Sequence, residues 1–384
     1  KLNTIYKLKI KKNKKFESNF MSNKFQEIYD QSIKNPEKFW QQASEDVFWF
    51  KKPTKILNKS NPPFYKWFED GVTNTCYNAL DIHIDKGRGE KTALIYDSPI
   101  TGNKSKFTYK DLKSKVSKFA GALKDQGTKK GDRVIIYMPM IPEAVIAMLA
   151  CARIGAIHSV VFGGFASNEL ASRIDDSKAK LIVTASCGFE PGRTVEYKPL
   201  VDEALKIANH KIEKLILFQR KDHEVKLNSP NEISWEEVMS IAKDTDCVEM
   251  KSNELAYILY TSGTTGTPKG IVRDTGGHIV ALKWTMKNIY NINADDIWWS
   301  ASDIGWIVGH SYIVYAPLFK GCTTVLFEGK PVGTPDAGAF WKIISDYKVK
   351  SLFTAPTAFR AIKKEDPEGK FFSKYDLNSF KSLF

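Results

Sequence analysis

The sequence is poor in cysteine and contains no long uninterrupted apolar run. Its five cysteines are scattered over 384 residues and form no C-x-x-C pair, which argues against a disulfide framework and a structural zinc and indicates a reducing compartment. The longest apolar stretches, around 134–157, are interrupted by Pro139, Pro142, Glu143 and Arg153. They are shorter than the ~18–20 apolar residues of a membrane-spanning helix, so we expect no membrane span.

Arginine is also scarce, although the formal net charge is +13. Only eight of the 57 basic residues are arginines, and the lysines are scattered rather than clustered with aromatic residues. Recognition of bases and phosphates relies on the arginine fork, so the composition disfavours a nucleic-acid partner. A lysine-rich solvated surface or an anionic small-molecule substrate accounts for the surplus. The six histidines have no ligand spacing, and we expect no metal held by side chains alone.

Residues 1–21 have the composition of a basic leader. The first 15 contain seven lysines and no acidic residue. The pattern is typical either of the end of an organellar targeting segment or of a disordered leader, and Met21 is compatible with a translation start. We expect disorder over residues 1–21 and an intracellular location, with the mitochondrial matrix and the cytosol both open.

Strand-like and helix-like segments alternate from about residue 92. Residues 92–97 predict a strand, and 107–127 predict a helix with Thr108 as its N-cap and Gly127 at its end. The strand segments are almost continuously apolar, as in strands covered on both faces. We therefore predict an α/β fold of mainly parallel sheets flanked by helices. The other predicted strands are 132–138, 158–162, 179–185, 213–218 and 255–260, and the other predicted helices are 142–156 and 167–177.

The stretch YTSGTTGTPKG, residues 260–270, carries the strongest functional signal. Its composition excludes a helix or a strand, yet it directly follows an apolar strand, and ligands bind at the carboxyl ends of parallel strands. Free N–H groups, hydroxyls and the Lys269 ammonium suit a polyphosphate. The spacing is neither that of the P-loop nor that of the dinucleotide fingerprint, and the buried strand before it argues against a flexible linker. The predicted phosphate-binding residues are Thr261, Ser262, Gly263, Thr264, Thr265, Gly266 and Lys269.

This motif resembles the phosphate loop of the AMP-forming acyl-CoA synthetases, within the adenylate-forming superfamily. Stretches such as "VIIYMPMIPEAVIAMLACARIGAIHSVVFGGF" and "SASDIGWIVGHSYIVYAPL" are similar to the short-chain branch, and the likeness extends from about Trp67 to Phe384. Arg273, Asp274 and Val332 are more similar to propionate–CoA ligases than to acetate enzymes. The resemblance implies an N-terminal helical cap segment over 22–91 and an incomplete AMP-binding domain over 92–384, truncated before its end and without the small C-terminal domain.

The resemblance also implies a two-step reaction that uses ATP, coenzyme A and Mg²⁺. A short-chain carboxylate attacks the α-phosphate of ATP, giving an acyl-adenylate and pyrophosphate, and the thiol of coenzyme A then displaces AMP. The catalytic lysine of such enzymes corresponds to a position after Phe384, so the catalytic residues are unknown here. We expect the chain alone to be inactive and to have exposed strand edges.

Two further segments receive roles from the resemblance. Glu190, Pro191, Gly192 and Arg193 would contact coenzyme A, with Arg193 on its nucleotide phosphate. Acetate enzymes carry a basic residue at the position of Glu190, and an ordinary surface turn is the alternative. The residues expected to line the acyl pocket are Trp306, Ile307, Val308 and Gly309.

The identity of the residue at Val308 bears on the acyl group. Acetate enzymes typically carry Thr there, so the methyl group of Val308 favours a longer acyl group, by only about 1–3 kcal/mol per methylene. His310 is expected to line the pocket, not to act as a base or metal ligand. The sequence thus predicts a propionate–CoA ligase, with acetate as the alternative substrate. A truncated, non-catalytic nucleotide- or coenzyme A-binding module is the alternative from another class.

Overall fold

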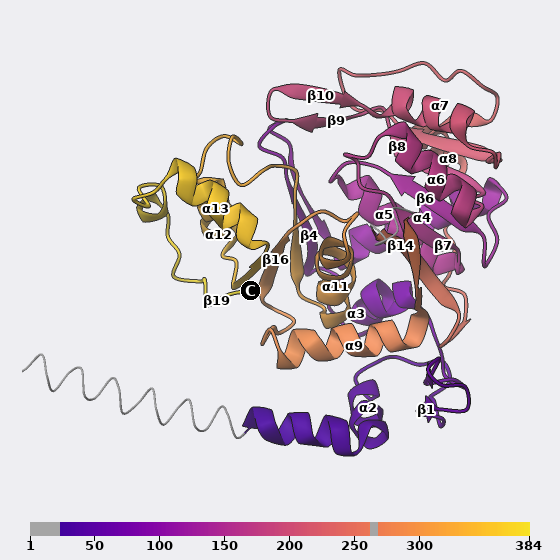
Figure 1. Cartoon of the computed structure of the whole chain (residues 1–384), viewed down its shortest axis with the longest axis vertical. Coiled ribbons are helices and arrows are strands. Elements are labelled where there is room, and N and C mark those ends of the chain that lie inside the picture. The colour runs from indigo at the N-terminus through magenta and orange to yellow at the C-terminus, as the bar shows by residue number, and fades with distance from the viewer. Residues whose placement is uncertain (1–23, 262–267) are drawn as a thin grey trace, which may run out of the picture.

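Two large sheets organise the chain in the computed structural model, which describes residues 24–261 and 268–384 (Figure 1). The first sheet has the strand order β12-β11-β8-β6-β7-β14-β15 and is parallel except for the pair β14–β15. Its strands are β6 (Arg133–Tyr137), β7 (Ile157–Val160), β8 (Leu181–Ala185), β11 (Lys214–Phe218), β12 (Glu232–Ser234), β14 (Leu255–Thr261) and β15 (Lys269–Asp274).

Alternating side chains of the first sheet pack on helices at both faces. Val134 and Ile136 of β6 belong to one core cluster and Ile135 to another, because successive side chains of a strand point to opposite faces. The helices on the first of these faces are α4 (Tyr109–Asp125), α5 (Pro142–Ile154) and α8 (Trp235–Ile241), and those on the second are α6 (Ser167–Ser177) and α7 (Tyr197–Ile207). The predicted mainly parallel α/β architecture is confirmed.

The second sheet has the order β19-β18-β16-β17-β4-β5, with β5 antiparallel to its neighbour and the other pairs parallel. Its strands are β4 (Thr92–Asp97), β5 (Lys104–Thr108), β16 (Ile297–Ala301), β17 (Thr323–Phe327), β18 (Ser351–Thr354) and β19 (Ser382–Leu383). One face packs on α12 (Ala339–Tyr347) and α13 (Pro356–Glu365), and the other on η2 (His310–Tyr315) and α11 (Ala316–Lys320).

Shorter elements complete the described chain. Residues 24–34 are helical, and α9 packs next to α2, which lies below it in Figure 1. These elements are α2 (Pro36–Ser44), β1 (Leu57–Asn58), β2 (Lys66–Trp67), β3 (Val72–Thr73), η1 (Tyr77–Asp81), α3 (Ile82–Asp85), β9 (Cys187–Glu190), β10 (Arg193–Glu196), β13 (Met250–Lys251), α9 (Thr275–Asn288), α10 (Ile307–Gly309) and η3 (Phe372–Lys374).

Local signals fix the ends of α4 as the sequence predicts. The Thr108 hydroxyl accepts a hydrogen bond from the backbone N–H of Asp111 at 3.0 Å, and the Asp111 carboxylate accepts one from the Thr108 N–H at 3.0 Å. This reciprocal capping box satisfies two backbone donors that a helix start leaves without partners. Gly127, just past the end, adopts a positive φ of 84°, which a side chain would disfavour.

The prediction that 260–270 contains no strand is wrong at both ends of that segment. Tyr260 pairs with Gly270 and Thr261 with Lys269, so the motif begins inside β14 and ends inside β15. A backbone ladder accepts these residues because its hydrogen bonds do not depend on the side chain. Residues 262–267, and the predicted leader over 1–21, lie outside the described residues.

Within 24–261 and 268–384, no helix is both long enough and apolar enough to cross a bilayer. The outer strand β15 leaves Ile271 and Val272 44% and 51% exposed, and Leu383 on β19 at the edge of the other sheet is 50% exposed. Exposed strand edges stay a prediction from the sequence.

Candidate active site

The β14–β15 hairpin brings the two described ends of the glycine-rich motif together. Thr261 and Lys269 are register partners and both are exposed. They stand at the carboxyl end of β14, which runs parallel to β7, so they share the edge where β6 and β8 also end. Ser262, Gly263, Thr264, Thr265 and Gly266, the remaining predicted phosphate ligands, lie outside the described residues.

Side chains of α6 brace this end of β14. The Tyr260 hydroxyl donates a hydrogen bond of 2.6 Å to Asp176, and the Arg173 guanidinium lies 5.4 Å from the Tyr260 ring centroid and 4.6 Å from that of Phe165. Cation–π contacts of this kind each contribute about 0.5–1 kcal/mol or more when shielded from water. The strand end that carries Thr261 is therefore held rigidly against α6.

The predicted coenzyme A segment forms a second hairpin. β9 and β10 are antiparallel, with Pro191 and Gly192 as the turn, and Gly192 has a φ of 75° that favours glycine. Arg193 donates hydrogen bonds of 2.9 and 2.6 Å to the Glu190 carboxylate, which holds the pKa of Glu190 below its usual value. The side chain of Arg193 is 69% exposed, so the hairpin presents a cation to solvent.

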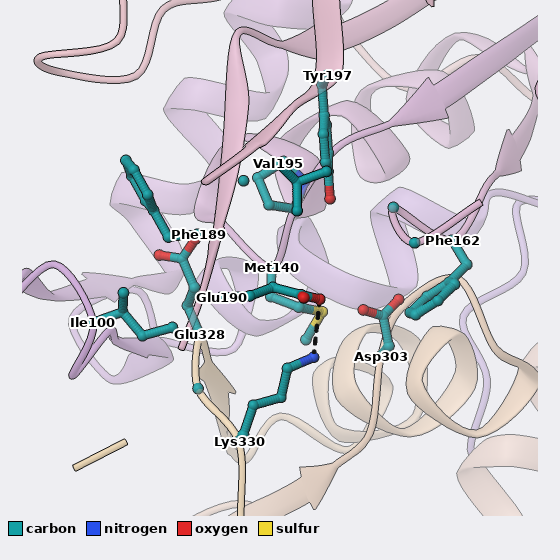
Figure 2. A pocket seen from close by; sticks show the side chains of 15 residues that line it. Ile100, Met140, Phe162, Phe189, Glu190, Val195, Tyr197, Asp303, Glu328 and Lys330 are labelled. Atoms are coloured by element: carbon teal, nitrogen blue, oxygen red, sulfur yellow. Dashed lines mark ion pairs between the residues drawn. The ribbon is translucent and has the colours of Figure 1, made fainter. Parts of the chain in front are cut away.

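A narrow cleft of about 60 Å³ lies beside this hairpin (Figure 2). It is formed where strands of both sheets end: Met140 follows β6, Phe162 follows β7, Asp303 follows β16 and Lys330 follows β17. This is the position at which open parallel sheets bind ligands. Glu190 reaches the cleft from the separate β9–β10 hairpin. The structure thus brings Glu190 to the cleft, while Pro191, Gly192 and Arg193 lie at the exposed tip of the hairpin.

Asp303 and Lys330 are cleft residues that the sequence did not single out. Burial raises the pKa of Asp303 to about 6, against smaller opposing effects of the Gly305 N–H and Lys330. Lys330 Nζ lies 3.5 Å from a Glu190 oxygen. Asp303 lies inside the segment that the resemblance assigns to the acyl pocket. Only its position directly after a strand could have marked it in the sequence as a site residue. A carboxyl group that titrates near neutral pH can hold or release a proton in the cleft.

Glu328, which lines the cleft, belongs to a buried ion pair. Arg220 follows β11 of the first sheet, and its guanidinium donates to both oxygens of Glu328, after β17 of the second sheet, at 2.8 and 3.1 Å. Tyr96 of β4 donates a short hydrogen bond to the same carboxylate. The three side chains fix how the loops of the two sheets meet.

The predicted acyl segment 306–309 splits between different surroundings. Trp306 packs against the rings of Phe162 and Phe165, at centroid distances of 5.4 and 5.9 Å, and remains 44% exposed. Gly309 is buried, and a Cβ on it would lie 1.9 Å from the carbonyl oxygen of Asp303. Because Gly309 has no side chain, the Asp303 backbone can pack directly against it. Val308 is partly buried.

Ile307 lines a larger cavity of about 450 Å³. Two buried polar groups that line it are Tyr257, whose hydroxyl has no partner among the described residues, and His278, whose two ring nitrogens have none there. Burial lowers the pKa of His278 to about 3, so this ring is neutral. The cavity is also lined by Trp40, Trp67, Phe68, Arg273, Asp274, Gly277, Val280, Ala281, Leu282, Ser311 and Tyr312. Its size is that of a site for a small organic ligand.

His310, expected to line the pocket, is instead part of the core. It is fully buried, its Nε2 lies 3.1 Å from Nε2 of His158, and its ring centroid is 4.1 Å from that of Tyr257. Burial lowers its pKa well below the usual range. It lines neither of the two cavities described above, because η2 turns it toward β7 and β14.

In this α/β fold, strands of both sheets end at the cleft, and the Gly/Ser/Thr-rich motif begins in β14 and ends in β15. The chain belongs to the AMP-binding enzyme family, whose sequence model matches residues 83–384, and the model for the acetyl-coenzyme A synthetase N-terminus matches 25–79. The resemblance noted in the sequence is thereby confirmed at the level of the family.

Named relatives point to the short-chain branch. The chain is 56% identical over 354 residues to "Acyl-CoA synthetase short-chain family member 3, mitochondrial" of Rattus norvegicus, covering 92% of this chain and 52% of the relative. It is 45% identical over 362 residues to "Propionate--CoA ligase" of Escherichia coli, covering 94% of this chain and 57% of the relative. The chain therefore spans about half the length of the curated relatives it matches.

Proposed function

We propose that the full-length protein joins a short-chain carboxylate, with propionate preferred, to coenzyme A through an acyl-adenylate, with release of AMP and pyrophosphate. The observation that carries this proposal is the β14–β15 register, which sets exposed Thr261 beside exposed Lys269 at the ligand-binding edge of the first sheet. Membership of the AMP-binding enzyme family supports the use of ATP.

The proposed role of the motif is to bind the β- and γ-phosphates of ATP. Thr261 and Lys269 would contribute a hydroxyl and an ammonium from the two sides, with Ser262, Gly263, Thr264, Thr265 and Gly266 between them. Charge builds up on the phosphate oxygens during transfer, so fixed donors stabilise the transition state more than the ground state. Mg²⁺ would supply further charge neutralisation when bound with ATP.

The proposed coenzyme A contact is the β9–β10 hairpin. Arg193 and Lys330 would attract the nucleotide phosphates, and Gly192 and Pro191 would give the backbone close access. The Glu190 carboxylate pairs with both cations, so an arriving phosphate competes with Glu190 for them. This competition distinguishes the chain from acetate enzymes that carry a basic residue at that position.

The proposed acyl site is the cavity behind Ile307, with Trp306, Val308 and Gly309 shaping its approach. Tyr257, Arg273 and His278 line it together with apolar walls, so a carboxylate has polar partners and its alkyl chain has an apolar surface. The volume of about 450 Å³ is ample for any short acyl group, so the preference for propionate over acetate, the alternative substrate, rests on Val308, Arg273 and Asp274. The alternative from another class is a nucleotide- or coenzyme A-binding module without catalysis.

The proposal includes three further statements. Partners are small molecules, with no nucleic acid. The location is intracellular, and the word "mitochondrial" in the names of several relatives supports the matrix over the cytosol. The isolated 384-residue chain would be inactive, since it spans about half the length of those relatives.

The deciding experiment measures carboxylate-dependent exchange of pyrophosphate into ATP by the full-length gene product. Acetate, propionate and butyrate are compared at equal concentrations, followed by coenzyme A-dependent release of AMP. We expect the highest kcat/KM with propionate. Exchange that is absent with all three acids, while nucleotide still binds, supports the non-catalytic module and contradicts the proposal.

A further inference from the structure

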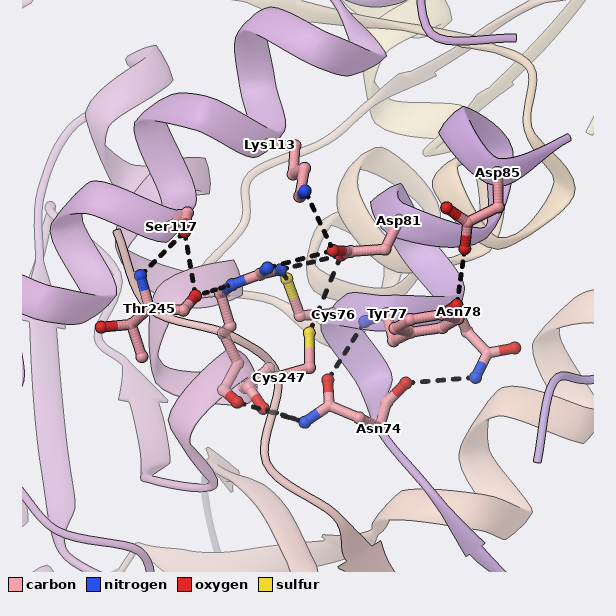
Figure 3. A network of polar contacts seen from close by, with 12 residues as sticks. Asn74, Cys76, Tyr77, Asn78, Asp81, Asp85, Lys113, Ser117, Thr245 and Cys247 are labelled. Carbon is pink, nitrogen blue, oxygen red and sulfur yellow. Dashed lines mark hydrogen bonds and ion pairs between the residues drawn. The ribbon is translucent and has the colours of Figure 1, made fainter. Parts of the chain in front are cut away.

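Cys76 and Cys247, far apart in the sequence, meet in a polar cluster (Figure 3), and neither cysteine lines the cleft. The sulfurs and an oxygen of Asp81 all lie within 4.8 Å of one another. Cys76 precedes η1 and is fully buried, whereas Cys247, on the segment between α8 and β13, is half-buried. Cys247 is thus the less buried residue of the pair.

The chain segments on both sides of this pair are held in place. Thr245 exchanges hydrogen bonds with Ser117, both at 2.9 Å, and the backbone N–H of Val248 donates to the Arg153 carbonyl at 2.9 Å. Asn74 lies two residues before Cys76, and its side chain donates a hydrogen bond to the Val248 carbonyl at 2.8 Å. These contacts keep the two sulfurs adjacent, so their reaction with each other needs little loss of chain entropy.

Charged groups stand at each sulfur. The Cys247 thiol donates to Asp81 at 3.7 Å, and Arg153 donates to the Cys76 sulfur at 3.5 Å while it holds Asp81 through two hydrogen bonds of 2.8 and 3.0 Å. Lys113 lies 3.7 Å from the same carboxylate. Two cations beside Asp81 disfavour a metal ion, because a divalent cation would be repelled by both.

We propose that Cys76 and Cys247 form a redox site that closes to a disulfide when the protein meets hydrogen peroxide. Cys247 attacks the peroxide, so that an S–O bond forms as the O–O bond breaks, and Asp81 relays the thiol proton to the leaving hydroxide. Cys76 then attacks the sulfenic sulfur, the S–S bond forms as the S–O bond breaks, and a second water leaves. Two thiols lose two protons and two electrons, and one peroxide becomes two waters.

The environment sets the sensitivity of the site. Burial, followed by the hydrogen bond with Cys76, raises the pKa of Cys247 well above its usual range, while Arg153 opposes this. The thiol is protonated at neutral pH, so the site responds to sustained peroxide and not to traces of it. The closed form would link the segment before η1 covalently to the segment after α8, and thiol reductants would reopen it.

The test treats the purified full-length protein with increasing hydrogen peroxide, blocks free thiols, and maps disulfide-linked peptides by mass spectrometry without reduction. We expect a Cys76–Cys247 linkage, with a mass lower by two hydrogen atoms, that dithiothreitol removes. Wild-type protein that stops at a Cys247 sulfenic acid, or that oxidises other cysteines while this pair stays reduced, overturns the proposal.

Variants identify the order of the two steps. In Cys76→Ser, dimedone should label Cys247 as a trapped sulfenic acid, whereas Cys247→Ser should leave Cys76 unlabelled. The control Cys151→Ser alters a fully buried thiol of α5 and should keep the linkage. Dimedone labelling of Cys76 in Cys247→Ser would contradict the assignment of Cys247 as the residue attacked first. Since the wild-type mapping needs no variant, a misfolded mutant does not remove the test.

Discussion

The guanidinium of Arg220 pairs with both carboxylate oxygens of Glu328, 108 residues further along the chain, and so connects the carboxyl ends of the two sheets. Both side chains are almost fully buried, at 7% and 4% exposure. Water cannot hydrate either charge there, so each charge is stabilised by its pairing with the other. This pair, with Tyr96, determines the separation of the loops that form the cleft.

Replacing Arg220 with Met should therefore strongly destabilise the folded protein. The change leaves the Glu328 carboxylate buried without a cation, at a cost of about 3–5 kcal/mol in the free energy of unfolding. Urea denaturation followed by tryptophan fluorescence measures it. The double variant Arg220→Met/Glu328→Leu should recover part of the loss, because both charges are gone. Lys206→Ala, at an exposed ion pair, serves as the control and should leave the midpoint unchanged. A small effect for Arg220→Met would show that water reaches the pair.

Lys269→Ala tests the proposed phosphate site. Loss of one donor aimed at the transferring phosphates should lower the ATP–pyrophosphate exchange rate of the full-length protein by about 10²–10³-fold. The variant should fold normally, because Lys269 is exposed at the start of β15. Lys206→Ala is again the matched control and should keep the wild-type rate. An unchanged ATP–pyrophosphate exchange rate in Lys269→Ala would contradict the assignment of Lys269 to the phosphate site.

Asp303 should make stability depend on pH in the acidic range. Its pKa is about 6 in the folded protein against an ordinary value of 3.8, so the folded state holds the proton more tightly than the unfolded state. The resulting stabilisation is complete below about pH 4 and is lost as the pH rises through about 6. The shift of roughly two pKa units corresponds to at most about 3 kcal/mol.

The measurement for Asp303 compares wild type with Asp303→Asn in urea denaturation at several values between pH 4 and pH 7. We expect the stability of wild type to fall relative to Asp303→Asn across this range, since the amide does not titrate. Parallel profiles would mean that solvent or Lys330 stabilises the charged carboxylate in the folded protein.

Gly309→Ala should disturb the cleft through the backbone. The added methyl group would lie 1.9 Å from the Asp303 carbonyl oxygen, and moving that backbone should cost about 1–3 kcal/mol. Thermal unfolding and the exchange assay should both report it. Gly89→Ala is the control, because the atoms nearest to its new methyl group are at 3.6 Å. Equal behaviour of the two variants would indicate that the Asp303 loop yields freely.

Ile307→Phe tests whether the cavity of about 450 Å³ receives the acyl chain. The larger ring should lower kcat/KM for butyrate more than for acetate, by about 10-fold or more in the ratio of the two. Steady-state kinetics of the full-length protein with each acid gives that ratio. Ile289→Phe, at a 49% exposed position past α9, should leave the ratio unchanged. A ratio that Ile307→Phe does not alter would place the acyl group elsewhere.

The sequence determined the elements and their class. Continuous apolar segments, the cap at Thr108 and the stop at Gly127 act within a few residues, so they can be recognised without knowledge of the rest of the chain. The glycine-rich motif after β14 was recognisable for the same reason, although the ladder that extends both strands into it was not. At both ends of the motif, pairing between β14 and β15 outweighed the local preference against a strand.

Only the tertiary structure decided which distant side chains meet. Asp303 and Lys330 enter the cleft because β16 and β17 end at it, and Arg220 reaches Glu328 because the two sheets converge. Cys76 and Cys247 look unrelated in the sequence and lie side by side in the fold. Strand order and the packing of one sheet on another set these contacts, and neither leaves a local signal, because the free energy that fixes them comes from burial shared over the whole core.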